Sequence, residues 1–316
     1  MNFSKDLMIT VPTFNRDALL EIWLQEHAKL MFSKNIRIHI QDNCSTDKTS
    51  SLLKKWKKQY KNISFEINKK NIHNKNFEKA INNCDSKFVW LVGDTYQING
   101  QLLDKVILKT KTHSPPFIIV NLKEKIKLLE DSYVDSNFVC EKLSGVLSCV
   151  SCVIYNRDLL GKIKFETHKI SIHFAHVIYI LNKLKFNNAK AYWISSSVYI
   201  LSGINKLKKN WADDPEKVFE VGCKNWILSI NSLIGYSFES KEKAYKLFSE
   251  ITNLFNWKGG LWLRSKNILS IRKINSYSDY LKKSNGKQYM YLYIITIIPV
   301  FILRILRKLF VKCLKK

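Results

Sequence analysis

Two acidic residues stand directly after stretches that have the character of buried strands. Asp94 follows the apolar run at residues 88–92, and Asp42 follows the alternating stretch at residues 36–41. Open α/β sheets bind ligands beyond the carboxyl ends of their strands, so carboxylates at these positions could hydrogen-bond a polar ligand. The other interpretation is that each residue only caps the turn or helix that follows it.

The segments around these residues alternate between strand and helix patterns. Apolar runs or strict alternation predict strands at residues 7–11, 36–41, 63–67 and 88–92. Apolar positions near helical spacing predict a helix in each interval between them. Four strands separated by three helices are typical of a parallel, doubly wound α/β sheet with right-handed crossovers.

The loop after the first strand limits the kind of nucleotide site. Residues 11–16 read Val-Pro-Thr-Phe-Asn-Arg, without a Gly-x-Gly-x-x-Gly pattern, and no Gly-x4-Gly-Lys-Ser/Thr pattern occurs in the sequence. This disfavours dinucleotide oxidoreductases and P-loop enzymes.

The composition excludes some partners and favours others. The net charge of +26 comes mostly from Lys, and no zinc-finger, RNP or helix-turn-helix pattern is present, so we expect no nucleic-acid partner. The charge fits either a compositional bias or attraction to an anionic membrane or a phosphorylated substrate. Seven scattered Cys and the lack of a signal-peptide pattern predict a reducing, cytoplasmic location. Cys149 and Cys152 are predicted to be structural thiols in a strand at residues 148–155.

Four motifs in the first hundred residues together resemble family 2 glycosyltransferases of the GT-A fold. Their spacing is similar to the abequosyltransferase-like branch of bacterial surface-polysaccharide enzymes. The likeness covers about residues 7 to 200, and it implies a GT-A type, Rossmann-like sheet domain of the α/β class. The motifs are Val11–Arg16, Asp42–Thr49, Asn71 with Asn76-Phe77, and Trp90–Asp94, followed by the weaker stretches Leu147–Arg157 and Ile172–His176.

The resemblance implies a site for a nucleotide-sugar donor that carries UDP, CDP, GDP or dTDP. Asp42 would hydrogen-bond the base, and Asp94 would contact the ribose or a metal-bound water. The other residues that the resemblance places at the donor are Pro12, Thr13, Asn15, Asn71 and Gly93.

The metal motif of the family is Asp-x-Asp, and here it reads Asp94-Thr95-Tyr96. Mg²⁺ or Mn²⁺ prefers several oxygen ligands, so one carboxylate with two phosphates gives a weakened site. Three outcomes stay open. Asp94 binds a divalent cation weakly with another ligand such as His176, or Lys and Arg neutralise the phosphates without metal, or the protein no longer transfers sugar.

The acceptor hydroxyl in such a reaction needs a general base. The family commonly uses Asp or Glu, but this stretch contains His168, His173 and His176, with Glu166 nearby. Histidine can serve because its ordinary pKa is near 6.5. We predict His176 as the base and His173 as the second candidate. The alternative is a structural cap or a core histidine at the start of an apolar helix.

The C-terminal third has a helical pattern and no catalytic constellation. We predict a catalytic domain at residues 1–205, a helical region at 206–285 and an apolar-basic tail at 286–316. The tail contains fifteen nearly apolar residues, at 289–303, followed by Lys and Arg. A spanning helix needs ~20 apolar residues, so the tail predicts peripheral attachment to the anionic inner face of the plasma membrane. A packed core helix and a homodimer contact are the alternatives.

These observations predict a glycosyltransferase that moves a sugar from a nucleotide sugar to a hydroxyl of a surface polysaccharide, such as capsule or lipopolysaccharide, or of a lipid-linked oligosaccharide. One alternative is a sugar nucleotidylyltransferase, which normally has a Gly-rich loop with a basic residue after the first strand. The other is a non-catalytic, membrane-associated protein that kept the fold and lost the second metal carboxylate.

Overall fold

The structure is a computed structural model that describes residues 3–165, 173–204, 207 and 214–305. It divides into two compact units. Each unit takes in segments from more than one part of the chain, and the predicted division at residues 205 and 285 stays a prediction. The first unit comprises Met1–Val139, Val146–Thr167 and Ala175–Lys208, and the second comprises Cys140–Gly145, His168–Phe174 and Lys209–Lys316.

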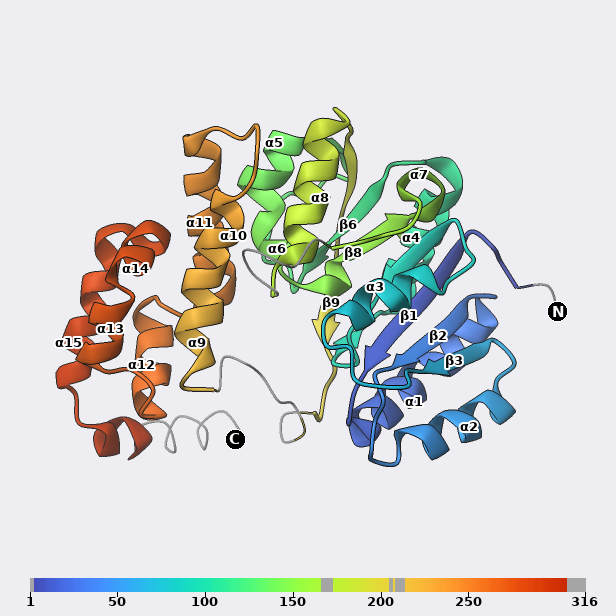
Figure 1. The fold of residues 1–316 in the computed structure, drawn as a ribbon, viewed down its shortest axis with the longest axis horizontal. Coiled ribbons are helices and arrows are strands. Elements are labelled where there is room, and N and C mark those ends of the chain that lie inside the picture. The colour runs from blue at the N-terminus through green and yellow to red at the C-terminus, as the bar shows by residue number, and fades with distance from the viewer. Residues whose placement is uncertain (1–2, 166–172, 205–206, 208–213, 306–316) are drawn as a thin grey trace. The chain divides into compact units, whose positions relative to one another are not determined.

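The first unit is built on a nine-stranded sheet with the strand order β3-β2-β1-β4-β8-β6-β9-β5, and β7 pairs with β9 (Figure 1). The strands are β1 (Leu7–Thr13), β2 (Arg37–Asp42), β3 (Ile63–Ile67), β4 (Phe88–Leu91), β5 (Tyr96–Gln97), β6 (Phe117–Leu122), β7 (Ser132–Val134), β8 (Val153–Asn156) and β9 (Ala191–Ile200).

Helices connect these strands. In chain order they are α1 (Asp17–Ser33), α2 (Thr49–Gln59), α3 (Lys75–Asn82), α4 (Gly100–Thr112), α5 (Ser136–Phe138), the π-helical turn η1 (Val139–Leu143), α6 (Ser144–Leu147), the 3-10 turn η2 (Val150–Cys152), α7 (Arg157–Leu160) and α8 (Ala175–Phe186).

The first four strands confirm the predicted parallel α/β sheet. β1 lies between β2 and β4 and runs parallel to both. All residues of β1 and β4 are buried, which explains why they read as continuous apolar runs. The strand order reverses direction at β1, so right-handed crossovers place α1 and α2 on one face of the sheet and α3 on the other. Figure 1 shows α3 in front of the sheet.

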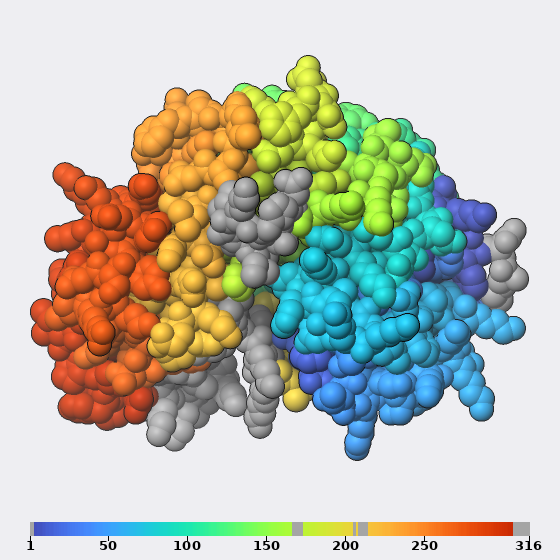
Figure 2. All heavy atoms as spheres, viewed as in Figure 1, coloured from blue at the N-terminus to red at the C-terminus, as the bar shows by residue number. Residues whose placement is uncertain are grey.

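The elements between residues 3 and 100 lie together in space. In Figure 2 the atoms of residues 3–100, coloured blue to cyan, form one continuous surface. The edge of the sheet where β1, β2 and β4 end is the topological switch point, at which open α/β sheets bind their ligands.

The prediction of a strand at residues 148–155 is wrong for the first half of this segment. Residues 150–152 form η2, and β8 begins only at Val153. The turn is stabilised by distant partners, because the N–H of Gly93 donates to Ser151 Oγ (2.9 Å) and Trp90 Nε1 donates to the Ser151 carbonyl (2.8 Å). The thiols of Cys149 and Cys152 are buried beside this turn, as structural thiols would be.

The described part of the second unit is helical, as predicted. A buried apolar cluster that includes Phe219, Phe255 and Leu292 forms its core. A Cβ on Gly259 would lie 2.0 Å from the Asn253 carbonyl oxygen, so only glycine lets α12 begin this close to the end of α11. The elements are α9 (Lys217–Phe219), η4 (Glu220–Asn225), α10 (Trp226–Asn231), α11 (Phe238–Thr252), α12 (Trp257–Ser265), α13 (Ile271–Ser276), α14 (Ser278–Asn285), η5 (Gly286–Met290), α15 (Tyr291–Ile297) and helical backbone at residues 300–305.

Candidate active site

The carboxyl ends of three parallel strands bring the two predicted carboxylates to one edge of the sheet. Thr13, at the end of β1, pairs with Asp42 at the end of β2. On the other side of β1, the N–H of Val92 donates to the Thr10 carbonyl (2.9 Å), and Asp94 follows two residues later. Asp42 and Asp94 therefore lie at the same edge, one on each side of the end of β1.

The loop after β1 is bonded to both neighbouring loops. The N–H of Asn15 donates to Ser45 Oγ (2.8 Å), and Asn15 Oδ1 accepts from the N–H of Thr46 (2.7 Å). The next residue, Arg16, donates from Nη1 to Asp94 Oδ1 (2.6 Å). Asn15 has a φ of 51°, in the left-handed region that Asn tolerates better than most residues.

The predicted donor residues of β1 and β2 line this edge in different ways. Pro12 and Thr13 are buried in the last positions of β1, and Thr13 Oγ1 has no partner among the described residues. The Asp42 carboxylate accepts from the N–H and Oγ of Ser45, which closes a turn. Burial raises the pKa of Asp42, and the Ser45 hydrogen bonds oppose that shift. A carboxylate has about four lone-pair sites, so this turn does not use all of them, while the Asp42 side chain itself is fully buried.

A network of asparagines supports the loop after β2, and the sequence prediction found only part of it. Asn43 Nδ2 donates to Asn71 Oδ1 (2.8 Å), and Asn68 Nδ2 donates to Asn43 Oδ1 (3.0 Å) and Asn76 Oδ1 (2.8 Å). Asn71, a predicted donor residue, is thus a partner of Asn43. Asn76, which belongs to the same motif, lies inside α3 and donates to the Gln41 carbonyl (3.1 Å).

Asp94 is held in a buried position by a short loop after β4. Its side chain is only 3% exposed, one oxygen is bonded to Arg16, and Oδ2 has no hydrogen-bond partner among the described residues. Burial raises the pKa of the Asp94 carboxyl, and the positive charge of Arg16 opposes that shift. The hydrogen bond from the N–H of Gly93 to Ser151 Oγ holds this loop in place.

The side chains present do not fit a divalent-cation site. Within the described part of the chain, no three His, Cys, Asp or Glu side chains gather as metal ligands would. One oxygen of Asp94 is bonded to Arg16. The second carboxylate of the Asp-x-Asp motif is replaced by Tyr96, whose ring packs beside Gly93. A hard cation would find one carboxylate oxygen here, where it prefers several.

His176 does not have the surroundings of a base or a metal ligand. It is buried, and its Nε2 is hydrogen-bonded to the Leu147 carbonyl (2.9 Å), so this nitrogen carries the proton. Burial lowers the pKa of His176 to about 4. The core interpretation therefore describes His176 better than the catalytic one. His173 belongs to the second unit, where its ring is exposed and Nδ1 lies 3.4 Å from Asn225 Nδ2. His168 and Glu166 lie outside the described residues.

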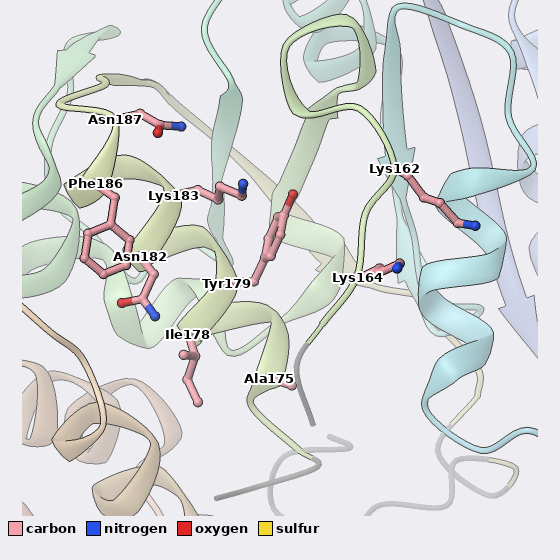
Figure 3. A pocket seen from close by; sticks show the side chains of 9 residues that line it. All are labelled: Lys162, Lys164, Ala175, Ile178, Tyr179, Asn182, Lys183, Phe186 and Asn187. Atoms are coloured by element: carbon pink, nitrogen blue, oxygen red, sulfur yellow. The ribbon is translucent and has the colours of Figure 1, made fainter. Parts of the chain in front are cut away.

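A separate pocket of about 360 Å³ lies between α8 and the loop after α7 (Figure 3). Lys162 and Lys164 come from the loop, and Lys183 comes from the helix. None of the predicted donor residues lines this pocket. We therefore assign the candidate active site to the edge formed by the loops after β1, β2 and β4.

The fold is similar to that of solved glycosyltransferases. TarS residues 1–349 of S. aureus in complex with UDP-GlcNAc superposes with a TM-score of 0.53 at 17% identity, over 91% of this chain and 83% of that one. The mannosyltransferase PcManGT of Pyrobaculum calidifontis, solved with GDP-Man and Mn²⁺, gives 0.55 at 12% identity, over 95% and 88%. At these identities the likeness shows the fold alone.

The sequence comparisons are more specific. The abequosyltransferase RfbV of Salmonella typhimurium is 24% identical over 221 residues, which cover 62% of this chain and 66% of the relative, slightly less than two thirds of its length. The family model described as Glycosyl transferase family 2 matches residues 8–175, more than half of the chain and the whole edge described above. The chain therefore belongs to glycosyl transferase family 2.

Proposed function

We propose that this protein transfers a sugar from a nucleotide-sugar donor to a hydroxyl group of a polysaccharide or lipid-linked oligosaccharide. One observation carries the proposal. Asp42 and Asp94 flank the end of β1 at the switch point of the sheet, and residues 15 and 16 of the intervening loop are bonded to both sides. Family membership supplies the reaction class, and the relatives include structures with UDP-GlcNAc and with GDP-Man.

The donor residues have separable tasks in this proposal. Asp42 accepts hydrogen bonds from the base, Asn15 and Asn71 shape the loops around the nucleotide, and Asp94 contacts the ribose. In the transfer, the bond from the anomeric carbon to the phosphate oxygen breaks and its electron pair goes to the nucleoside diphosphate. The acceptor oxygen bonds to the anomeric carbon, and the hydroxyl proton passes to a base. His173 is the proposed base.

The acceptor proposal rests on the relative and on the surface of the second unit. An abequosyltransferase is the curated relative, which favours a surface polysaccharide such as lipopolysaccharide or capsule. Neither alternative from the sequence is favoured, because the loop after β1 has no Gly-rich segment and the family model extends across the whole donor edge.

The last described helices present an apolar surface that fits a membrane. We name it the tail face, and it comprises Tyr291, Ile294, Ile297, Phe301, Ile302 and Ile305, each at least 39% exposed. Leu292, Ile295 and Leu303 of the same segment are buried. In the described residues, no helix is long and apolar enough to cross a bilayer.

The charge around the tail face matches an anionic lipid surface. No Asp or Glu follows Asp279 in the sequence, whereas Lys or Arg occurs at positions 282, 283, 287, 304, 307, 308, 312, 315 and 316. Apolar side chains with flanking cations are the pattern of a segment that lies in the interface of an anionic leaflet. We propose peripheral attachment to the inner face of the plasma membrane, where a lipid-linked acceptor would be presented. Residues 306–316 lie outside the described part of the chain.

Nucleotide binding tests the proposed function directly. The protein would be heated with UDP, CDP, GDP or dTDP and with the corresponding sugars, and donor hydrolysis or transfer would be followed in parallel. We expect one nucleotide to raise the unfolding temperature, and we expect Asp42→Ala to abolish that rise. Glu66→Ala, a change at an exposed residue of β3 outside the proposed donor residues, is the control. The absence of any response to all four nucleotides would contradict the proposal.

A further inference from the structure

Arg16 stands out among the basic residues of the donor edge because it contacts a proposed donor residue. It is the N-cap residue of α1, directly after the loop that follows β1. Its guanidinium lies 2.6 Å from Asp94 Oδ1, and its side chain is 31% exposed, whereas that of Asp94 is 3% exposed. One end of this ion pair is therefore accessible from solvent and the other is buried.

Because Asp94 is buried, its carboxylate needs a cation beside it. Removing a carboxylate from water is costly unless a cation and hydrogen bonds replace the solvent. Arg16 is the cation that the structure provides, and Asp94 Oδ2 has no further partner among the described residues. Because the carboxylate is fixed by its loop, it holds the guanidinium at the donor edge.

The reaction needs positive charge at this place. Negative charge grows on the nucleoside diphosphate as the sugar–phosphate bond breaks, and a metal ion or a positioned cation can stabilise it. The carboxylates present do not fit a metal, as shown above. A guanidinium is planar, always protonated, and able to donate two parallel hydrogen bonds to phosphate oxygens.

We propose that Arg16, anchored on Asp94, is the catalytic residue that contacts the donor diphosphate and supplies the charge that an Asp-x-Asp-bound metal would supply. This inference rests on the proposed function and adds to it. The electron pair of the broken bond remains on the diphosphate oxygen, and the guanidinium donates hydrogen bonds to the phosphate oxygens throughout. Transfer then requires no divalent cation.

Two measurements test the proposal. First, transfer or donor hydrolysis by the wild-type protein is expected to change less than 2-fold, a rough limit, when EDTA replaces Mn²⁺, and Arg16→Gln is expected to lower the rate about 100-fold in either condition. Second, Arg16→Gln is expected to weaken binding of the nucleoside diphosphate about 10-fold, as for loss of one charged hydrogen bond, while binding of the nucleoside without phosphates stays unchanged. Arg16→Lys keeps the charge and should recover part of both losses.

A matched control is available on the opposite edge of the sheet. Arg37, the first residue of β2, lies 2.6 Å from Asp85 Oδ1 in a pair with a similar distance but far along the strands from Asp42. Arg37→Gln should leave transfer and nucleotide affinity unchanged. Unfolding temperatures of both variants report on the fold. If Arg16→Gln unfolds, Arg16→Lys takes its place, because lysine keeps a cation beside Asp94 but cannot donate two parallel hydrogen bonds, and it should show the same two losses at smaller size.

The outcomes separate this inference from the proposed function. Activity of the wild-type protein that disappears in EDTA, or full activity of Arg16→Gln, would overturn the assignment of Arg16 and leave the glycosyltransferase proposal intact. Equal loss of nucleoside and nucleoside diphosphate binding would also overturn it, since it would point to a structural effect. A wild-type protein that binds no nucleotide would contradict the proposed function itself.

Discussion

His173 and His176 are three positions apart in the sequence but have different surroundings. His176 is enclosed by the core of the first unit, whereas His173 is exposed in the second. The pKa of His173 is still lowered from its usual value, because the protein around the ring removes part of its water. Both rings are therefore neutral at pH 7, but only that of His173 has access to solvent.

The proposed base gives a pH dependence with a definite sign. A histidine base must be neutral, and the pKa of His173 lies below 6.5, so transfer should be at its maximum at neutral pH and fall only in more acidic solution. His173→Gln is expected to lower the rate about 100-fold and to remove this acidic decline. Donor binding should not change.

Rate profiles from pH 5 to 8, measured for the wild-type protein and for both histidine variants, check this prediction. His176→Gln is the comparison, because it should lower the unfolding temperature by disturbing the Leu147 hydrogen bond without altering the shape of the profile. An unchanged rate in His173→Gln would show that another group accepts the proton.

The place of a residue in the fold could be predicted where its neighbours along the chain determine it. Asp42 is the last residue of β2 and Asp94 follows β4 after a short turn, as the strand patterns before them indicate. Arg16 and Asn68 were missed as site residues because their partners, Asp94 and Asn43, are distant in the sequence. A single sequence shows which residues can form such bonds, but it does not show which of many candidates meet.

At the scale of elements, α1 is attached to the segment after Asp94 by two aromatic side chains. Trp23 Nε1 donates to the Tyr96 carbonyl (3.0 Å), and the ring of Trp23 stacks on that of His27 at 4.4 Å. His27 Nδ1 is bonded to the Trp23 carbonyl (2.7 Å), and its Nε2 accepts from the N–H of Ile98 (3.0 Å). The accepting nitrogen must be unprotonated, so this contact requires neutral histidine.

This contact predicts acid sensitivity. Burial lowers the pKa of His27 to about 4, below the value of 6.5 expected in the unfolded chain. Between these values the unfolded state binds more protons, so the stability is complete above pH 6.5 and is lost as the pH falls towards 4. The loss from this one group amounts to at most about 3 kcal/mol.

Urea unfolding at pH 7 and pH 5 measures the effect. The loss of unfolding free energy between the two pH values should be smaller in His27→Gln than in the wild-type protein, because glutamine does not titrate. His73→Gln, at an exposed histidine, should behave like the wild type. If all three proteins lose the same free energy, His27 does not contribute to the acid sensitivity.

Element prediction was most successful for the first four strands. β1 to β4 were expected within two residues of their observed ends. β1 and β4 are buried throughout and read as apolar runs, whereas β2 and β3 were found from the alternation of apolar and polar residues. The segment at 148–152 alternates like a strand but forms a turn, since Ser151 bonds to the loop after β4 and to Trp90. The alternation of apolar and polar residues therefore predicted the wrong secondary structure, because tertiary hydrogen bonds determine the backbone conformation here.

At the scale of the whole molecule, the tail face predicts binding to anionic vesicles. The triple variant Ile294→Gln/Ile297→Gln/Phe301→Gln removes apolar area while keeping every charge, so co-sedimentation with phosphatidylglycerol-containing vesicles should fall about 10-fold or more. High salt should weaken the binding of the wild-type protein, and neutral phosphatidylcholine vesicles should bind it poorly.

The first unit offers a matched control for this experiment. Leu108, Leu129 and Phe186 are also exposed, at 55%, 85% and 62%, and their triple replacement by glutamine should leave vesicle binding unchanged. Equal losses in both triple variants would show that the tail face is not special. A shift of the wild-type protein to a dimer that only the tail variant abolishes would assign the face to a second copy of the chain instead.

The hydrogen bonds from Asn15 to Ser45 and Thr46 have a thermodynamic consequence for ligand capture. The loops after β1 and β2 are joined to each other by the protein alone. Ordering a flexible segment costs conformational entropy when a ligand binds, and these hydrogen bonds shift part of that cost to folding. An incoming ligand therefore loses less of its binding free energy to the ordering of these two loops.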